Sequence, residues 1–252
     1  MKLLAFIPAR MESKRFPNKI LKKIFNIPMI EHVRRRILIS KVFDDIYVVS
    51  NNKNIINKIY INKKNLLITK KKHFSGTSRV AEVSKKKKYD YGFIIFADEP
   101  FIDPKIFKVC KRFIRKNPKA EIFNVTTNLK DRDMESQQVV KVVVDKYDYV
   151  KNYFRKKTKI LSKLKIVKSC GIIIFRKKLL DKLKLLKSSQ EERKTKIEQI
   201  KFLDNGYKIK SVFFKNIKAS INTVKELKDI LKEVKSDKKQ LKIISNIKKI
   251  ES

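Results

Sequence analysis

Apolar runs of strand length alternate with helical patterns along most of the chain. Tyr91–Asp98 (YGFIIFAD) is the most apolar of these runs. It shows no alternation of apolar and polar positions, which is typical of a parallel strand buried on both faces. The predicted strands are Leu3–Pro8, Asp45–Ser50, Asn65–Thr69, Tyr91–Asp98, Glu121–Asn128, Cys170–Phe175 and Tyr207–Phe214.

Helical patterns lie between these strands. The segment Met29–Ser40 (MIEHVRRRILIS) has apolar residues at helical spacing. Its Ile30, Val33 and Ile37 are expected to face the core, and Leu38 lies at the margin of the same face. The predicted helices are Met29–Ser40, Asn54–Ile59, Thr77–Lys87, Pro104–Arg115, Gln190–Leu203, Thr223–Val234 and Lys239–Ile250.

This β-α-β alternation predicts a doubly wound α/β sheet, with the loops that follow its strands on one edge, where ligands bind. The middle of the chain departs from the pattern. Val139–Val144 and Tyr149–Phe154 flank the turn DKYD and predict a hairpin. The basic, weakly patterned segment Arg155–Lys168 predicts an excursion after the hairpin. We therefore expect a mixed sheet within a single domain over residues 1–252.

Composition limits the class of protein. The 252 residues, 42% of them hydrophobic, suffice for a buried core. No apolar stretch approaches the ~20 residues that a membrane span needs. The opening MKLLAFIPA has too short an apolar run for a secretory signal. Cys110 and Cys170 lie far apart without a CxxC spacing, which favours a reduced, cytoplasmic chain without a structural zinc site.

The formal net charge of +40 raises the question of nucleic-acid binding. Lysines are spread over almost every segment, however, and no RRM, zinc-finger or KH pattern occurs. Lys, Ile and Asn have A/T-rich codons and are abundant, whereas the chain has only 4 Gly and no Trp. Codon drift therefore explains the charge, and we expect loose, salt-sensitive binding to polyanions but no specific nucleic-acid partner.

Positive charge is nevertheless concentrated in one loop. After the first strand, ARMESKRFPNK holds Arg10, Lys14, Arg15 and Lys19. Turns are typically made by Gly, Asn or Ser, whereas phosphate oxygens are bound by Arg forks and Lys ammonium groups. The alternative is a surface turn enriched in lysine by drift, but A/T drift explains the arginines less well. The loop therefore predicts a phosphate site.

Three further motifs each allow two interpretations. In HFSGTSR (73–79), Ser75 and Gly76 open a helix, either as a plain capped start or as a ligand site. In FADEP (96–100), two carboxylates at the end of a buried strand suit either Mg²⁺ or a simple acidic turn. In INTVKEL (221–227), Asn222 or Thr223 is a candidate cap of the following helix.

Taken together and in this order, the motifs resemble the CMP-Kdo synthetase family, the 3-deoxy-manno-octulosonate cytidylyltransferases, over nearly the whole chain. IPARMESKRFPNKIL is similar to the family's nucleotide loop, PMIEHV to the start of its first helix, HFSGTSRVAEV to its Ser-Gly-Thr helix and DEPFIDP to its acidic loop. VVKVVVD and YF are similar to its central hairpin, and IEQIKFLDNGYKI to its late helix and strand. The ordered set is specific, whereas any single motif would be weak.

The resemblance implies a Rossmann-like nucleotidyltransferase fold whose hairpin and excursion, at about residues 130–190, form a homodimer contact. It implies a cytoplasmic enzyme of lipopolysaccharide synthesis. With Mg²⁺, such an enzyme converts CTP and a 3-deoxy-ulosonic acid (Kdo or a close relative) into the CMP-sugar and pyrophosphate. The sugar's anomeric hydroxyl would attack the α-phosphorus, and catalysis would consist mostly of positioning and charge neutralisation.

The resemblance also implies the residues of the site. Arg10 and Lys19 match the family's phosphate-contacting positions. Lys14 and Arg15 lie between them and either assist in binding the phosphates or are solvated. The implied catalytic residues are Arg10, Lys19 and Asp98, and the implied metal ligands are Asp98 and Asn222. The implied nucleotide-binding residues are Ala9, Arg10, Lys19, Ser75, Gly76, Arg79 and Phe96. The implied sugar-binding residues are Pro100, Gln138, Lys141, Lys156, Ser169 and Glu192.

Several positions depart from the family pattern. Asn18 and Asn26 stand where Gly is usual, and those turns are expected to survive because Asn tolerates left-handed backbone. Phe96 replaces a Gln that helps to read the ligand, and Ser169 replaces a His. Asn222 replaces the second metal-binding Asp. These changes suit a relative with a changed sugar acid, a fast-drifting active enzyme or a partly degenerate copy.

Two alternatives to this function stay open. A sialate-type or other CMP-sugar synthetase shares the fold, but such enzymes usually have a Gly-richer first loop and lack the DEP element. Methylerythritol-type cytidylyltransferases also favour a Gly-rich loop. A non-catalytic, polyanion-binding relative on the same scaffold is the second alternative. Pyrophosphate release from CTP with a sugar acid separates the enzymes from the binding protein.

Overall fold

The computed structural model describes residues 1–10, 13, 15–52, 55, 59, 62–70, 73, 75–156 and 164–250. Lys14 and most of the short helix predicted for Asn54–Ile59 lie outside these residues. The chain divides into two compact units, one of Met1–Lys108 with Lys218–Ser252 and one of Val109–Ile217. The single domain expected over the whole chain stays a prediction.

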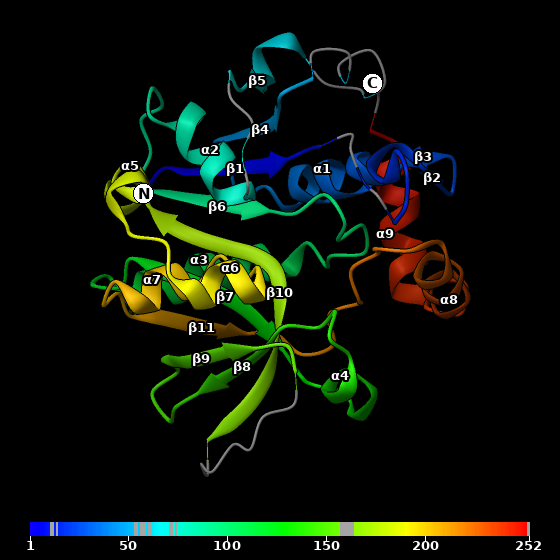
Figure 1. Ribbon diagram of the computed structural model, residues 1–252. Helices are drawn as coiled ribbons and strands as arrows, with labels where there is room; N and C mark the ends of the chain where they lie inside the picture. Colours follow the sequence, from blue (N-terminus) through cyan, green and yellow to red (C-terminus); the bar gives the residue numbers. More distant parts are fainter. Residues whose placement is uncertain are drawn as a thin grey trace. The chain divides into compact units, whose positions relative to one another are not determined.

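The first unit is built on parallel strands. Their hydrogen-bonded order is β6-β1-β4-β5. β4 and β5 therefore lie on one side of β1, and β6 lies on the other side. Figure 1 shows these strands side by side, with β1 in dark blue. This order confirms the predicted doubly wound parallel arrangement. The strands are β1 (Leu3–Pro8), β4 (Asp45–Ser50), β5 (Leu66–Ile68) and β6 (Tyr91–Ile95), the last ending before the predicted Asp98.

The helices of the first unit follow the predicted apolar spacing closely. In α1, Ile30, Val33 and Ile37 are at most 1% exposed, whereas Leu38 is 39% exposed and belongs to the solvent face. The helices are α1 (Met29–Ser40), α2 (Gly76–Ser84), α8 (Val224–Lys235) and α9 (Lys238–Lys248), and α3 (Lys105–Lys116) runs on into the second unit. Shorter elements, which the apolar pattern did not predict, are η1 (Lys19–Leu21), β2 (Lys23–Ile24), β3 (Ile27–Pro28) and η3 (Lys63–Asn65).

The two last helices complete the first unit. Figure 1 shows α9, in red, beside α8 and α1. Arg35 on α1 donates from Nη1 to the carbonyl oxygen of Ile247 in the last turn of α9, at 2.9 Å. Gln240 on α9 donates from Nε2 to the carbonyl oxygen of Phe101, at 3.1 Å. These bonds satisfy buried polar groups that would otherwise destabilise the packed helices.

The second unit contains a mixed sheet. β7 pairs with β11 in parallel and with β10 in antiparallel fashion, and β8 pairs in antiparallel fashion with both β10 and β9. The β8–β9 pair confirms the predicted hairpin. The strands are β7 (Ile122–Thr127), β8 (Lys141–Val144), β9 (Val150–Phe154), β10 (Lys165–Arg176) and β11 (Ile209–Phe213).

Two predictions for the second unit need correction. β10 begins at Lys165, inside the predicted excursion Arg155–Lys168, because its first four residues pair with β8. The long helix predicted for Gln190–Leu203 is two helices, separated where Lys196 adopts a left-handed φ of 56°. The helices of this unit are α4 (Asp131–Glu135), α5 (Lys177–Asp181), η4 (Leu183–Leu185), α6 (Gln190–Thr195) and α7 (Ile200–Asp204).

Left-handed backbone occurs at both asparagines for which it was expected. Asn18 has φ 53° and Asn26 has φ 68°, so the turns that usually need Gly form here with Asn. Across the described ranges, no helix has the length and apolar character required to cross a membrane.

Candidate active site

The loops after β1 and β6 leave the first unit's sheet at the point where its strand order reverses. In open α/β sheets, ligands bind at such a point, beyond the carboxyl ends of the strands. The loop after β1 carries Arg10 and Lys19, and the loop after β6 carries Asp98. The fold therefore brings the predicted phosphate loop and the predicted acidic loop to one place.

Lys19 contacts both predicted metal ligands. Its Nζ donates to Asp98 Oδ2 at 2.9 Å and to Asn222 Oδ1 at 3.1 Å. The Lys19 side chain is 13% exposed and that of Asp98 is 26% exposed, so solvent reaches the ion pair only in part. One ammonium group thus joins three segments that lie far apart in the sequence.

A hydrophobic cluster holds these segments in place. Phe16 lies three residues before Lys19, Phe101 lies three residues after Asp98, and Ile221 directly precedes Asn222. All three apolar side chains are at most 4% exposed and belong to one cluster with residues of α1, α8 and α9. The main chain adds a bond from Ile221 N–H to the carbonyl oxygen of Asp98, at 2.8 Å. The polar contact therefore rests on packed core rather than on mobile surface.

The structure decides which residue caps α8. Thr223 is the N-cap, and its hydroxyl accepts from Glu226 N–H at 3.1 Å. The Glu226 carboxylate accepts in return from the backbone N–H groups of Thr223 and Asn222. The interpretation that Asn222 caps the helix is therefore wrong. Its side chain faces Lys19, and its Nδ2 donates to Ser220 Oγ at 3.3 Å.

The start of the phosphate loop presents an exposed cation. Ala9 is buried, and its N–H donates to the carbonyl oxygen of Val49 at 2.8 Å, which continues the pairing of β1 with β4. Arg10 follows directly and is exposed. Its guanidinium makes no hydrogen bond or ion pair within the described part of the chain. The next predicted cation, Lys14, lies outside the described residues, and Arg15 is exposed.

Ser75 and Gly76 form the start of α2, where Ser75 is the N-cap and accepts from Ser78 N–H at 3.0 Å. A Cβ atom on Gly76 would lie 2.7 Å from Phe96 Cε1 and 3.2 Å from Pro8 Cγ. Only Gly therefore permits the half-buried Phe96 ring to pack against the helix start. The predicted nucleotide residues Ser75, Gly76 and Phe96 thus lie together.

Arg79 connects two of the loops at this edge. It is 7% exposed and donates from Nη1 to Asn51 Oδ1 at 2.8 Å and to the carbonyl oxygen of Ala9 at 3.4 Å. Asn51 follows β4, so the guanidinium spans the ends of two neighbouring strands. Arg79 is therefore placed to position the loops. Pro100, the predicted sugar contact in this unit, is buried two residues after Asp98.

The remaining predicted sugar residues belong to the second unit. Lys141 is fully buried, and its Nζ donates to the carbonyl oxygens of Ser136 at 2.5 Å and Arg155 at 2.6 Å. Burial lowers the pKa of this ammonium group from its usual value, against the attraction of the nearby Asp133. Lys156 is exposed and directly follows Arg155. Lys141 therefore holds the backbone beside Lys156.

Arg155, which directly precedes the predicted sugar residue Lys156, bonds to the backbone of two other segments. It donates from Nη1 to the carbonyl oxygen of Gln138 at 2.9 Å and from Nε to the carbonyl oxygen of Thr195 at 2.8 Å. It thereby joins the predicted residue Gln138 to α6, which carries Glu192 in its first turn. The adjacent cations Arg155–Lys156 were visible in the sequence, but their backbone partners were not.

Ser169 and Glu192 already have partners within the second unit. Ser169 Oγ donates to Asn124 Oδ1 at 3.0 Å, and the same oxygen accepts from Tyr153 at 3.1 Å. Glu192 Oε1 lies 3.7 Å from Lys201 Nζ. The sugar-binding roles of these residues stay predictions.

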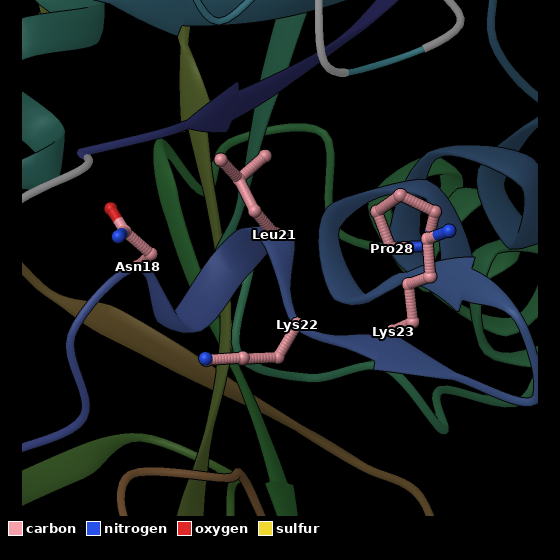
Figure 2. A pocket seen from close by; sticks show the side chains of 5 residues that line it. All are labelled: Asn18, Leu21, Lys22, Lys23 and Pro28. Carbon is pink, nitrogen blue, oxygen red and sulfur yellow. The ribbon is translucent and has the colours of Figure 1, made fainter.

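A shallow hollow of about 360 Å³ is lined by residues that follow the first part of the phosphate loop in sequence, beginning with Asn18. Figure 2 shows its lining: Asn18 before η1, Leu21 at the end of η1, Lys22 directly after it, and Lys23 and Pro28 from the paired strands β2 and β3. None of the predicted site residues lines it. Lys22 nevertheless provides a useful comparison for Lys19, because it is an exposed lysine three residues further along the chain.

Comparison with known proteins places the chain in a family. Residues 4–246 match the family model described as Cytidylyltransferase. A 3-deoxy-manno-octulosonate cytidylyltransferase of Fusobacterium nucleatum is 30% identical over 243 residues, covering 94% of this chain and 98% of the relative. One of the same name from Geotalea daltonii is 29% identical over 250 residues, covering 93% of this chain and 99% of the relative.

A solved structure supports the fold. A CMP:2-keto-3-deoxy-manno-octonic acid synthetase complexed with CTP superposes with a TM-score of 0.85 at 24% identity, covering 94% of this chain and all of that one. The Rossmann-like nucleotidyltransferase fold expected from the motifs is thereby confirmed. The chain belongs to the cytidylyltransferase family and, within it, to the 3-deoxy-manno-octulosonate cytidylyltransferases.

Proposed function

We propose that this protein transfers the cytidylyl group of CTP to a 3-deoxy-ulosonic sugar acid, Kdo or a close relative, and releases pyrophosphate. The observation that carries the proposal is the contact of Lys19 with Asp98 and Asn222 where the strand order reverses. This contact supplies a cation and two hard oxygen acceptors at the place where α/β proteins bind nucleotides. Family membership supports the choice of CTP and of the sugar class.

In the proposed reaction, the anomeric hydroxyl of the sugar attacks the α-phosphorus of CTP. The bond from the hydroxyl oxygen to the α-phosphorus forms while the bond from the α-phosphorus to the oxygen shared with the β-phosphate breaks. The hydroxyl proton passes to solvent, and pyrophosphate leaves. Arg10 and Lys19 neutralise charge on the triphosphate and on the leaving group. The exposed guanidinium of Arg10 suits this role because no described residue engages it.

The donor set at Asp98 and Asn222 is compatible with Mg²⁺. A carboxylate oxygen and an amide oxygen are ligands of the hard type that Mg²⁺ prefers. Among the described residues, no group of three or more His, Cys, Asp or Glu side chains is placed to hold a metal. Substrate phosphate and carboxylate oxygens would therefore complete the coordination. When bound, the ion would neutralise charge on the reacting phosphates.

The sugar acid requires cations of its own. We assign its carboxylate to the second unit, where Lys156 is exposed beside Arg155. Lys141 fixes the backbone there by donating to the carbonyl oxygens of Arg155 and Ser136. Lysine and arginine are the usual partners of carboxylates. Phe96 has no group that could donate or accept a conventional hydrogen bond, so we assign it to van der Waals contact with the nucleotide.

The direct test is pyrophosphate release. The full chain is incubated with CTP, Mg²⁺ and a panel containing Kdo, other 3-deoxy-ulosonic acids and N-acetylneuraminate, with UTP and ATP as nucleotide controls. We expect turnover with CTP and a 3-deoxy-ulosonic acid. Arg10→Ala should reduce kcat/KM by roughly 30- to 1000-fold, the loss of one charge-assisted contact of about 2–4 kcal/mol in the transition state.

Lys22→Ala is the matched control for Arg10→Ala. Lys22 is exposed and belongs to the same segment, but it carries no predicted role. Its removal should change kcat/KM less than twofold. Preference for N-acetylneuraminate would replace the sugar assignment, and no pyrophosphate release with any sugar acid would overturn the transferase proposal.

Three further properties belong to the same proposal because the family resemblance implies them. The product would serve lipopolysaccharide synthesis, the reaction would take place in the cytoplasm, and the hairpin-containing part of the second unit would form a homodimer contact. The dimer is the most accessible of these, because light scattering after size-exclusion chromatography measures the mass in solution against the 29.9 kDa of one chain.

A further inference from the structure

The ammonium group of Lys19 contacts Asp98 Oδ2 and Asn222 Oδ1, the two oxygens that a metal ion shared by these residues would bind. Both oxygens accept from the same nitrogen, at 2.9 and 3.1 Å. We propose that Lys19 is the resident cation of this pair, and that the nucleotide triphosphate draws Lys19 away before a divalent cation binds at Asp98. Metal binding at this site would then require nucleotide. The inference rests on the proposed function, because it concerns the same site.

The charges of the three side chains support this order. Asp98 contributes one negative charge and Lys19 one positive charge, while Asn222 offers only a neutral amide oxygen. The group is therefore electrically balanced without any metal. A divalent cation approaching Asp98 would meet a balanced ion pair and would be repelled by the ammonium group at close range. Because the pair is largely shielded from solvent, screening by water weakens this repulsion only in part.

Asn222 is what makes the group balanced. An aspartate at this position would give two negative charges against one positive charge, and the remaining negative charge would attract a divalent cation. The backbone at Asn222 is fixed by its bond to Glu226 and by the buried neighbour Ile221. An aspartate introduced there would therefore present its carboxylate at the same place. The neutral charge of the group therefore depends on one side-chain atom, the amide nitrogen that Asn222 has in place of a carboxylate oxygen.

Lys19 can leave the pair without moving the loop. Its backbone N–H donates to the carbonyl oxygen of Phe16 at 3.1 Å, and its carbonyl oxygen accepts from Lys22 N–H at 3.1 Å. The backbone is thus held in η1 while the four-carbon side chain keeps its rotatable bonds. A triphosphate carries several negative charges, whereas Asp98 carries one. The ammonium group would therefore follow the triphosphate and release Asp98.

Mn²⁺ without nucleotide is the probe for the first half of the proposal. Free Mn²⁺ is counted by electron paramagnetic resonance as the ion is titrated into the full chain. Wild type should bind Mn²⁺ weakly at this site, whereas Lys19→Met and Asn222→Asp should each bind it at least tenfold more tightly. Lys22→Met, which removes a neighbouring charge outside the contact, should behave as wild type.

Two results would contradict this half. One is Mn²⁺ binding by Lys19→Met and Asn222→Asp that is no tighter than by folded wild type. The other is tight Mn²⁺ binding by wild type that Asp98→Asn abolishes. Asn222→Asp keeps the Lys19 side chain, so it retains the test if Lys19→Met fails to fold.

CTP with EDTA is the probe for the second half. Isothermal titration calorimetry without metal should show CTP binding to wild type, weakened at least tenfold by Lys19→Met. Unchanged binding would mean that the triphosphate does not engage Lys19. Neither measurement requires turnover. A chain that passes both but releases no pyrophosphate would overturn the proposed function alone, and an active chain whose Mn²⁺ binding ignores Lys19 would overturn this inference alone.

Discussion

At the scale of single residues, substitutions by asparagine have opposite consequences in two parts of the site. Asn18 and Asn26 adopt left-handed backbone and so preserve turns that Gly would otherwise make. At Asn222, for which the family resemblance implies a metal-binding Asp, the amide has the shape of that carboxylate but not its charge. The first kind of change is tolerated because the backbone requirement is conformational. The second alters the electrostatics of the site while leaving the fold intact.

Gly76 provides a prediction at this scale. Gly76→Ala should destabilise the protein by about 1–3 kcal/mol, the usual cost of forcing an extra methyl group into packed surroundings. The reason is that the new Cβ would lie 2.7 Å from Phe96 Cε1. Urea denaturation of the single variant measures the change in the free energy of unfolding.

The control is the same substitution in a Phe96→Ala background. With the ring removed, Gly76→Ala should cost less than half as much, because the close contact no longer exists. An equal cost in both backgrounds would show that Phe96 is not the reason for Gly at this position.

At the scale of elements, the sequence predicts what depends on apolar periodicity and misses what depends on single backbone angles. The boundaries of β1, α1 and β4 agree with the apolar runs because their residues are buried in the pattern those runs predict. The break at Lys196 has no Gly or Pro to announce it. The first residues of β10 are basic, and only their pairing with β8 makes them a strand.

The cap of α8 was predictable in principle. Thr223-Val224-Lys225-Glu226 has the spacing of a capping box, in which Thr and Glu each satisfy the other's backbone N–H. That signal identifies Thr223 as the cap and leaves the Asn222 side chain for another partner. That partner is Lys19, which lies 203 residues away in the sequence. The local sequence around Asn222 carries no information about so distant a contact.

His32 links α1 to β2 and gives a pH-dependent prediction. Its Nε2 lies 2.6 Å from the carbonyl oxygen of Ile24, and its Nδ1 is buried without a hydrogen-bond partner among the described residues. Burial, together with the charges of Arg36 and Arg35, lowers the pKa of His32 to about 4, although the bond to Ile24 opposes the shift. His32 is therefore neutral in the folded protein at pH 7.

The sign of the effect follows from the unfolded chain, in which histidine titrates near 6.5. Stability should be fully present above pH 6.5 and should fall as the pH drops toward 4, because the unfolded chain takes up the proton first. Between pH 6.5 and 5 the loss should reach about 2 kcal/mol. The measurement is the free energy of unfolding by urea over this pH range in the His73→Gln variant. This variant lacks the only other histidine of the sequence, so His32 is its only titrating histidine. A free energy of unfolding that stays constant over this range would contradict the assignment.

At the scale of the whole molecule, the net charge of +40 is spread over the chain rather than gathered at the site. Most of the described ion pairs, such as Lys168 with Asp133 and Lys151 with Asp145, join one lysine to one carboxylate, whereas Lys218 contacts both Glu233 and Asp237. Such pairs contribute little to stability when they are exposed. We therefore expect the excess positive charge to act mainly as a long-range field that attracts polyanions.

The corresponding prediction concerns nucleic acids. Duplexes of random sequence should bind with similar affinity, and binding should weaken steeply between 50 and 200 mM salt, roughly as expected when several phosphates are neutralised. Fluorescence anisotropy over a salt series measures both properties. Discrimination of roughly 10³ or more for one sequence over random sequence at physiological salt would mean that the charge has a specific function.

The division of the first unit into two separate stretches of chain affects how the protein is made. On a ribosome, Lys19 and Asp98 emerge early, whereas Asn222, α8 and α9 emerge only after all of Val109–Ile217 has been synthesised. The second unit is one continuous stretch and can be completed first, although it is encoded later than most of the first. Until α9 arrives, Phe101 lacks Ile244 of its hydrophobic cluster, and Arg35 on α1 lacks its bond to the carbonyl oxygen of Ile247. During translation, we therefore expect the half-made first unit to expose apolar surface until the last helices are added.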